Sequence, residues 1–486
     1  MYIRLLVTIP MAFYTSRVVL QQLGDDNFGI YQTVAGTITM FAVLRGAFDS
    51  AAQRYYNYAL AKGNNNYLSQ IFSACIVIHV VLAFLLILMI YCFGHWFIST
   101  KMQYPPGSEE DVYFVFYTMI VSIAFIIFTI PFTGMVIARE HIQFYAFISV
   151  LDVALKLILV LLLIFINDDK LRIYAIFQMS VSILLFMITA IYFVIHFRDV
   201  RLSKFSKKDF SDLTTFSSWG LLGNICYALV TEGVNLLLNV FGGVVANTAR
   251  GISFQVRGVI TNILTSTLTA VRPQATQLFI KTDYADFWKL IYSYSKYIFL
   301  IASLMMLPII FYARPILQLW LGHVPEYSCL FLQLIMGYSM VRSFHEPIDI
   351  IFKASGRMKT YQLTTICISS LTFFLSWIAL HYDYPLYSPF VIFTIIEGIL
   401  LYALLMKAQK EGISIRLYLN LVIKPCFVYL SVTAIIGIVI SWYINSWILA
   451  IALTIISNII FALTIGLNST ERKQIKSIVI AHLIKK

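Results

Sequence analysis

Long runs of apolar residues constrain the fold of this chain more than any other feature. A helix needs about 20 predominantly apolar residues to cross the hydrocarbon core of a bilayer, and about fourteen such segments occur in the sequence. Only 12% of the 486 residues are charged and 60% are hydrophobic, so polar groups are too few to cover the surface of a soluble protein. We therefore predict an all-α polytopic membrane protein. The predicted spans are residues 2–22, 28–60, 68–92, 111–137, 142–166, 172–196, 212–240, 246–279, 288–311, 328–354, 359–380, 389–408, 416–441 and 446–467.

Lysine and arginine lie mainly on one side of the predicted membrane. The loops after even-numbered spans, together with the C-terminal segment, hold 18 of these residues, whereas the loops after odd-numbered spans hold 4. Because basic loops stay in the cytoplasm, we expect both termini to be cytoplasmic. The first span is not followed by a small-residue cleavage site, so we interpret it as a helix and not a signal peptide. The net charge of +12 then reflects topology and anionic lipid headgroups, and no nucleic-acid partner is expected.

The second half of the chain repeats features of the first half. Residues 21–54 align with residues 239–273 at an offset of 218, and residues 131–145 align with residues 347–361 at an offset of 216. Two matches at nearly the same offset predict two parallel six-helix bundles, related by a pseudo-two-fold axis along the membrane normal, with a substrate path between them. The predicted parts are an N-terminal lobe at 1–200, a C-terminal lobe at 201–410, and two extra helices with a basic cytoplasmic tail at 411–486.

Charged side chains inside the predicted spans are the candidate functional residues. A charge at the bilayer centre costs about 2.5–3.5 kcal/mol on insertion scales, so it needs a partner or water. At about 1.5 Å per residue, Arg45 lies about 25 Å and Asp49 about 30 Å along the second span, near the expected cytoplasmic mouth. The candidate substrate-binding arginines are Arg17, Arg45, Arg250, Arg257 and Arg342. The candidates for proton or sodium coupling are Asp49, Asp152, Glu232 and Glu397.

Some of these charges have an opposite charge one helical turn away, which allows the two to neutralise each other. Such pairs are Arg45 with Asp49, Asp152 with Lys156, and Arg342 with Glu346. Arg17 and Arg257 have no acid three or four residues away, so we favour a functional role for these two. Glu397 fits two interpretations equally: a protonatable coupling site, or the partner of an arginine on another helix.

An excess of arginine over acid inside the membrane indicates an anionic substrate. Arginine stays charged and its planar fork holds a phosphate group at two points. No HExxH, GxSxG, GxxxxGK[ST] or DxD-type motif occurs, and the six cysteines form no CxxC or Cys/His cluster. We therefore predict no catalytic residue, no metal site, no cofactor and no ATP motor in this chain.

Five short segments carry a resemblance to a known family: TSRVVL (15–20), LG…NFGIY (23–31), SAAQR (50–54), GISFQVRGVI (251–260) and IIFKASGRMKTY (350–361). They resemble the Wzx-type polysaccharide flippases, the O-antigen and capsule translocases of the multidrug/oligosaccharidyl-lipid/polysaccharide exporter superfamily. The resemblance implies alternating-access flipping of an undecaprenyl-pyrophosphate-linked oligosaccharide from the cytoplasmic to the periplasmic leaflet of a bacterial inner membrane. Because no ATP motif occurs, we expect transport to rest on a gradient of H⁺ or Na⁺, or on the gradient of the substrate itself. The resemblance also implies that Arg17, Arg45 and Arg257 hold the pyrophosphate. A polysaccharide polymerase and other export-complex proteins are the partners that it implies.

Two other functions stay open. A multidrug/cation antiporter of the same superfamily typically has twelve helices and cavity acids, so the two extra helices and the arginines count against it. A membrane-embedded polysaccharide polymerase or glycosyltransferase usually has a sizeable periplasmic loop or a cytoplasmic catalytic domain. The predicted outer loops of this chain are short.

Overall fold

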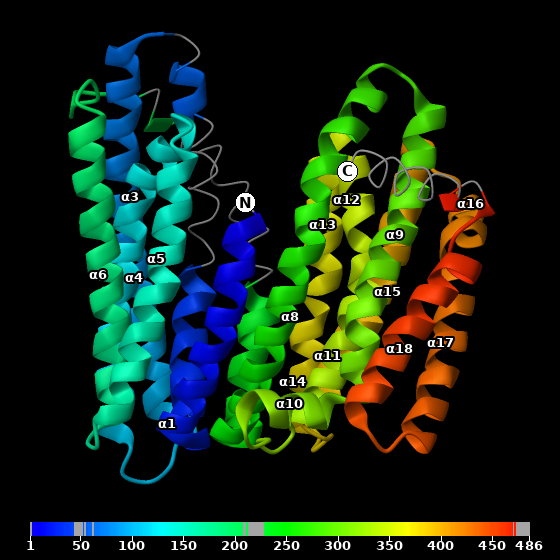
Figure 1. Cartoon of the computed structure of the whole chain (residues 1–486). Coiled ribbons are helices and arrows are strands. Elements are labelled where there is room, and N and C mark those ends of the chain that lie inside the picture. Colours follow the sequence, from blue (N-terminus) through cyan, green and yellow to red (C-terminus); the bar gives the residue numbers. More distant parts are fainter. Residues whose placement is uncertain are drawn as a thin grey trace, which may run out of the picture. The chain divides into compact units, whose positions relative to one another are not determined.

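The computed structural model describes residues 2–42, 52, 55–60, 63–207, 210–211, 228–469 and 471–472. Within these residues all regular secondary structure is helical, as predicted, and no strand occurs. Figure 1 shows the long helices in sequence colours, with α3, α4, α5 and α6 running side by side. Contacts between residues divide the chain into two compact units. Unit 1 comprises Met1–Thr248, Trp320–Pro325 and Leu380–Tyr382, and unit 2 comprises Ala249–Leu319, Glu326–Ala379 and Asp383–Lys486. The predicted lobe boundaries at residues 200 and 410 stay predictions.

Unit 1 holds the N-terminal helices and the beginning of a long helix, α8, that continues into unit 2. Its elements are α1 (Tyr2–Ala42), α3 (Asn65–Thr100), α4 (Glu109–Ala138), α5 (Ile142–Leu162) with the 3₁₀ turn η1 (Leu163–Phe165), α6 (Lys170–His196), the π-helical turn η2 (Leu229–Gly233) and the first part of α8 (Val234–Ile280). Acidic residues occupy the first turn of α4, where they favour the positive end of the helix dipole. One of them, Asp111, accepts a 2.5 Å bond from Arg172 of α6, which ties the ends of the two helices together.

Unit 2 holds the remainder of α8 and the C-terminal helices. Its elements are α9 (Tyr284–Phe311), α10 (Ala313–Leu321, whose last two residues belong to unit 1), α11 (Ser328–Ser343), α12 (His345–Ala354), α13 (Met358–Ser369), α14 (Leu371–His381), α15 (Ser388–Ala408), η3 (Gln409–Glu411), α16 (Ile415–Tyr418), η4 (Leu419–Ile423), α17 (Lys424–Tyr443), α18 (Trp447–Phe461) and η5 (Ala462–Gly466). Behind η5, Glu471 forms a buried ion pair with Lys296 of α9 at 2.5 Å. This pair fixes the end of the described chain to α9.

Ten helices among the described residues are long and apolar enough to cross a membrane. Nine of the predicted spans each overlap one of them, and the tenth helix, Leu229–Thr265, covers parts of the predicted spans 212–240 and 246–279. Several predicted boundaries are wrong. α3 continues to Thr100 where a loop was expected from residue 93, and the predicted span 328–354 is broken between α11 and α12. The predicted breaks after residues 22 and 240 are kinks inside α1 and α8.

Two glycines join pairs of predicted spans. Gly24 in α1 has φ 76° and Gly243 in α8 has φ 65°, and both lie inside otherwise continuous helices. A positive φ is open to glycine at little cost, so each helix turns there without ending. The two kinks lie at equivalent places in the predicted repeat, although the proposed alignment matched Gly24 with Gly242 and is therefore one residue out of register.

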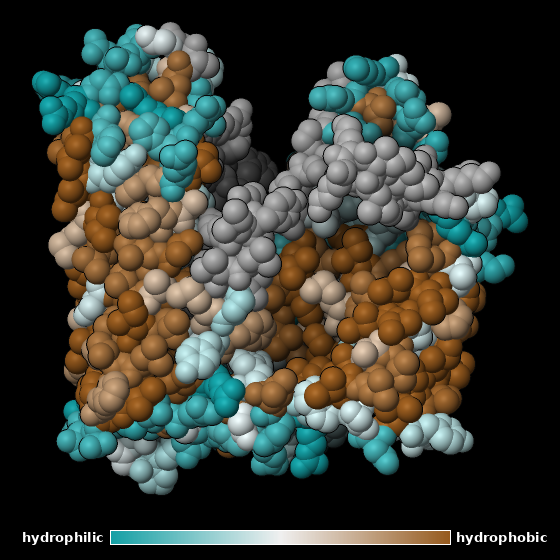
Figure 2. Space-filling view, viewed as in Figure 1, coloured by the Kyte–Doolittle hydropathy of each residue, from teal (hydrophilic) through white to brown (hydrophobic). Residues whose placement is uncertain are grey.

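The outer surface of the helices carries large apolar side chains. Over the helices of unit 1, Figure 2 shows a brown apolar band between teal polar ends. Phe84 of α3 is 67% exposed and Val194 of α6 is also 67% exposed. Exposed apolar surface of this extent on parallel helices is what a lipid-facing surface requires. The chain is a multi-pass membrane protein.

Candidate functional site

The most concentrated charge in the membrane-spanning part of unit 2 lies where α11 ends. Arg342 occupies the last turn of α11, and its Nη1 donates to Oε1 of Glu397 on α15 at 3.0 Å and to Oε2 at 3.3 Å. The Glu397 side chain is 6% exposed and the Arg342 side chain is 30% exposed. The carboxylate is therefore buried, whereas part of the guanidinium still reaches the surface of the unit.

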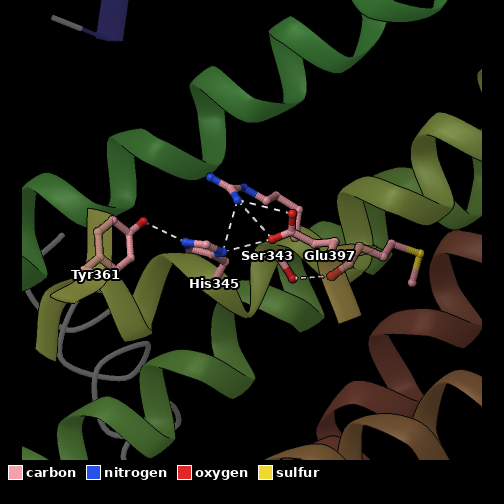
Figure 3. A network of polar contacts seen from close by, with 6 residues as sticks. Ser343, His345, Tyr361 and Glu397 are labelled. Atoms are coloured by element: carbon pink, nitrogen blue, oxygen red, sulfur yellow. Dashed lines mark hydrogen bonds and ion pairs between the residues drawn. The ribbon is translucent and has the colours of Figure 1, made fainter. Parts of the chain in front are cut away.

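His345 connects this ion pair to α13. Its Nδ1 lies 2.9 Å from Oε1 of Glu397 and 3.1 Å from Nη1 of Arg342, and its Nε2 lies 2.7 Å from the hydroxyl of Tyr361. An ionised carboxylate only accepts and a guanidinium only donates, so Nδ1 bonds one of them at a time. With a proton on Nδ1, Tyr361 donates to Nε2 and Nδ1 donates to Glu397. Figure 3 shows this chain, with Ser343 bonded to the backbone of its own helix beside it.

The break between α11 and α12 explains why sequence spacing predicted the wrong partner for Arg342. The i,i+4 rule pairs Arg342 with Glu346 only if one helix continues through both residues. The helix is interrupted at Phe344, and Glu346 forms no ion pair within the described residues. Glu397 is the partner of an arginine on another helix, and its role as a coupling site stays a prediction.

Two further candidate arginines follow one face of α8. Arg250 and Arg257 are seven residues apart, and the ring of Phe254 lies between them. The Arg250 guanidinium carbon is 4.0 Å from the centre of that ring, and the Arg257 carbon is 5.3 Å from it. Arg257 also lies 5.1 Å from the ring centre of Tyr338 on α11. These distances fit cation–π contacts.

The surroundings of Arg257 differ from those of Arg342. No carboxylate of the described residues pairs with Arg257, and its Nε is buried without a hydrogen-bond partner among them. Tyr338 packs against Phe393 at 5.2 Å between ring centres, and each of these rings lies one helical turn before a member of the Arg342–Glu397 pair. Unit 2 thus brings Arg250, Arg257, Arg342 and Glu397 into one continuous set of contacts.

The remaining described candidates lie in unit 1. Arg17 is half-buried on α1, on the same face as Phe13 and Gln21. The backbone carbonyl of Phe13 accepts a hydrogen bond from the indole N–H of Trp320, and the side-chain amide of Gln21 donates one to the carbonyl of Leu321. Glu232 lies in the π-helical turn η2, close to Gly36 of α1.

Asp152 on α5 forms the predicted pair with Lys156, at 2.9 Å. The structure does not bring Asp152 into contact with Arg17 or Glu232. Arg45 and Asp49 lie outside the described residues.

Sequence reasoning missed four side chains of the unit 2 site: Phe254, Tyr338, His345 and Tyr361. His345 lies three residues from Arg342, and this spacing on a predicted helix was a usable signal. Tyr361 lies at the end of the segment IIFKASGRMKTY, where it was used for alignment only. No group of three or more histidine, cysteine, aspartate or glutamate side chains fit to hold a metal ion is found in the part of the chain that the structure describes.

No protein-family model matches the sequence, and no curated protein matches it either. Solved structures do match the fold. An inward-facing multidrug-resistance MATE transporter of the MOP superfamily superposes with a TM-score of 0.71 at 12% identity, over 84% of this chain and 97% of that chain. The lipid II flippase MurJ in an inward closed conformation has a TM-score of 0.70 at 14% identity, over 93% of this chain and 98% of that chain.

A third match is a MOP-superfamily transporter from Pyrococcus furiosus, with a TM-score of 0.59 at 13% identity, over 84% of this chain and 95% of that chain. The chain therefore has the fold of the MOP-superfamily transporters, in agreement with the predicted fold class.

Proposed function

We propose that this protein is a transporter that moves an undecaprenyl-pyrophosphate-linked oligosaccharide from the cytoplasmic to the periplasmic leaflet of a bacterial inner membrane by alternating access. The observation that carries the proposal is Arg257. It is a permanent cation within a membrane-spanning helix, held by two aromatic rings, with a buried Nε that has no partner among the described residues. An oxygen-rich anion such as a diphosphate supplies the missing acceptors.

The neighbouring charges support an anionic substrate. Arg250 shares the face of Arg257, and Arg342 extends the cationic surface across to α11. Glu397, the nearest acid of the site, is engaged by Arg342 and His345 and is almost completely buried. Glu397 is therefore not free to bind an organic cation. Arg17 and Arg45 stay predicted pyrophosphate contacts on the strength of the sequence resemblance.

The fold agrees equally with a multidrug antiporter and with a lipid-linked glycan flippase, because neighbours of both kinds match with similar scores. The flippase neighbour matches a larger share of this chain. Together with the resemblance in sequence to polysaccharide flippases and the arginines of α8, this favours the flippase function. Polymerase and other export-complex partners belong to the same proposal.

A translocation assay tests the proposal. Purified protein is reconstituted in liposomes that contain a fluorescent undecaprenyl-pyrophosphate-linked oligosaccharide, and the fraction of label exposed on each leaflet is followed over time. We expect Arg257→Gln to abolish most of the translocation and Arg257→Lys to retain part of it, because lysine keeps the charge and loses the fork. Arg357→Gln is the matched control, since Arg357 pairs with Glu411 and is 52% exposed.

Two results would contradict the proposal. In one, wild-type protein leaves the labelled lipid on its original leaflet under every imposed pH or sodium gradient. In the other, Arg257→Gln translocates it at the wild-type rate. A drug-susceptibility panel on a deletion strain separates the antiporter, because only loss of an antiporter sensitises cells to cationic drugs while surface glycan stays normal.

A further inference from the structure

A cavity of about 460 Å³ lies inside unit 1, among α4, α5 and α6. It shares no residue with the arginine site of unit 2. Its volume falls within the range of about 300–1,000 Å³ that is typical of small-molecule sites. Of the α5 residues, only Val160 is buried, so the remainder of this helix borders the cavity or the surface.

The charges on the cavity wall neutralise each other. Nζ of Lys156 lies 2.9 Å from Oδ1 and 3.0 Å from Oδ2 of Asp152, and both residues line the cavity. No other charged residue lines it. A free anion placed there meets the carboxylate and a free cation meets the ammonium, so the wall favours a ligand without net charge.

Hydroxyl groups from two other helices face the same space. Thr129 of α4 and Ser182 of α6 donate to carbonyls of their own helices, at 2.8 and 3.1 Å, and this leaves their oxygens able to accept. The Thr133 hydroxyl on α4 has no hydrogen-bond partner within the described residues. The wall therefore offers donors and acceptors together, which suits a ligand whose groups are both.

The depth of the cavity makes a structural role for these polar groups costly. Asp152 lies about 15 Å along α5 from Ile142, which is the middle of a hydrocarbon core about 30 Å thick. Ionisable residues at this depth mark a substrate or ion path in most membrane proteins. Apolar side chains, Ile130, Ile148 and Leu185, complete the wall, so the cavity presents polar and apolar surface side by side.

We propose that this cavity is a binding subsite for a neutral pyranose ring of the transported glycan. A sugar hydroxyl both donates and accepts, so it matches Lys156, Asp152 and the threonine hydroxyls, and the apolar face of a pyranose ring packs on the isoleucine and leucine side chains. The assignment rests on the proposed function, because it takes the ligand to be part of the lipid-linked oligosaccharide.

Saturation-transfer NMR on the full chain in nanodiscs tests the assignment directly. The probes are the methyl glycosides of glucose, galactose and N-acetylglucosamine, with glucosamine as the cationic and glucuronate as the anionic comparison. We expect transfer to at least one neutral glycoside and a loss of most of that signal in Lys156→Met and in Thr133→Val. Lys353→Met is the matched control, because Lys353 forms the same i,i+4 pair with Asp349 but lines no part of this cavity.

Each outcome bears on the assignment. It is overturned if no neutral glycoside shows transfer, if Lys156→Met and wild type give equal signals, or if only glucosamine or only glucuronate binds. Thr133→Val guards against loss of folding, since it exchanges a hydroxyl for a methyl group, and Thr133→Ser is expected to restore the signal. The translocation assay is a separate readout. If wild-type protein binds glycosides but does not move the labelled lipid, the proposed function is contradicted and the sugar site stands. If it moves the lipid but binds no glycoside, only the sugar site is contradicted.

Discussion

Arg342 and Glu397 lie 55 residues apart on different helices, and a 3.0 Å bond joins Nη1 of the arginine to Oε1 of the glutamate. The pair is buried on the carboxylate side, so removal of one partner leaves an uncompensated charge in unit 2. The cost of such a change is about 3–5 kcal/mol, whereas replacement of both partners by apolar residues is often close to neutral.

We therefore expect Arg342→Met to lower the thermal stability of the purified protein more than the double variant Arg342→Met, Glu397→Leu does. The double-mutant cycle isolates the coupling between the two side chains. Glu110→Gln provides the comparison, because Glu110 pairs with Arg172 and its side chain is 89% exposed, so a loss of about 0–1 kcal/mol is expected. The cycle is completed by Glu397→Leu. A loss in the double variant equal to the sum of the two single-variant losses would mean that Arg342 and Glu397 contribute independently.

The bonds of His345 predict a proton-coupled step. Tyr361, His345 and Glu397 form a chain in which one proton on the imidazole decides whether Nδ1 bonds Glu397 or Arg342. If this chain carries the coupling proton, Tyr361→Phe keeps the ring and breaks the chain at its end. We expect translocation driven by an imposed pH gradient to fall to the level of protein-free liposomes.

Tyr402→Phe is the control for this change, since Tyr402 is an exposed tyrosine on the helix that carries Glu397. A sodium gradient applied to the same vesicles tests the other coupling ion. Normal pH-driven transport by Tyr361→Phe would exclude the relay and return the coupling role to the remaining acidic candidates.

A buried asparagine network predicts where unit 1 is most sensitive to a polar-to-apolar change. Oδ1 of Asn239 accepts from the backbone N–H of Gln103 at 2.8 Å, and its Nδ2 donates to Oδ1 of Asn247 at 3.0 Å. Asn239→Leu leaves the N–H of Gln103 and Oδ1 of Asn247 without this partner. The cost is about 1–3 kcal/mol for a buried polar group that loses its hydrogen bond. Thermal unfolding measures the loss.

The control for this prediction is Asn458→Leu. Asn458 is equally buried, but its Oδ1 accepts only one 3.3 Å bond, from Tyr429, and its Nδ2 has no partner among the described residues. We expect a smaller loss of stability than for Asn239→Leu. A loss of stability in Asn239→Leu that is no larger than the loss in Asn458→Leu would contradict the prediction that the asparagine network stabilises unit 1.

The spans were predictable from sequence because the length and the apolar composition of a segment are enough to identify a membrane helix. The kinks at Gly24 and Gly243 were not, since a glycine between two apolar segments fits a loop between helices as well as a kink inside one helix. Local spacing predicted the Asp152–Lys156 pair correctly because both residues belong to one unbroken helix. The same rule failed for Arg342, whose partner is set by the packing of α11 on α15, and long-range packing is not readable from one sequence.

The close approach of α1 to α8 gives the last prediction. A Cβ on Gly29 would lie 2.3 Å from the backbone carbonyl oxygen of Val244, so the two helices have to separate to admit it. A Cβ built on Gly398 of α15 meets no atom within 4 Å, so a methyl group fits there. We expect Gly29→Ala to destabilise the protein by about 1–3 kcal/mol and Gly398→Ala to stabilise it by about 0.5–1 kcal/mol. Both are helical glycines, so the difference in thermal stability reports the close packing of α1 on Val244 and Thr248 of α8. Equal shifts for the two variants would mean that α1 and α8 tolerate a wider separation than their backbones show.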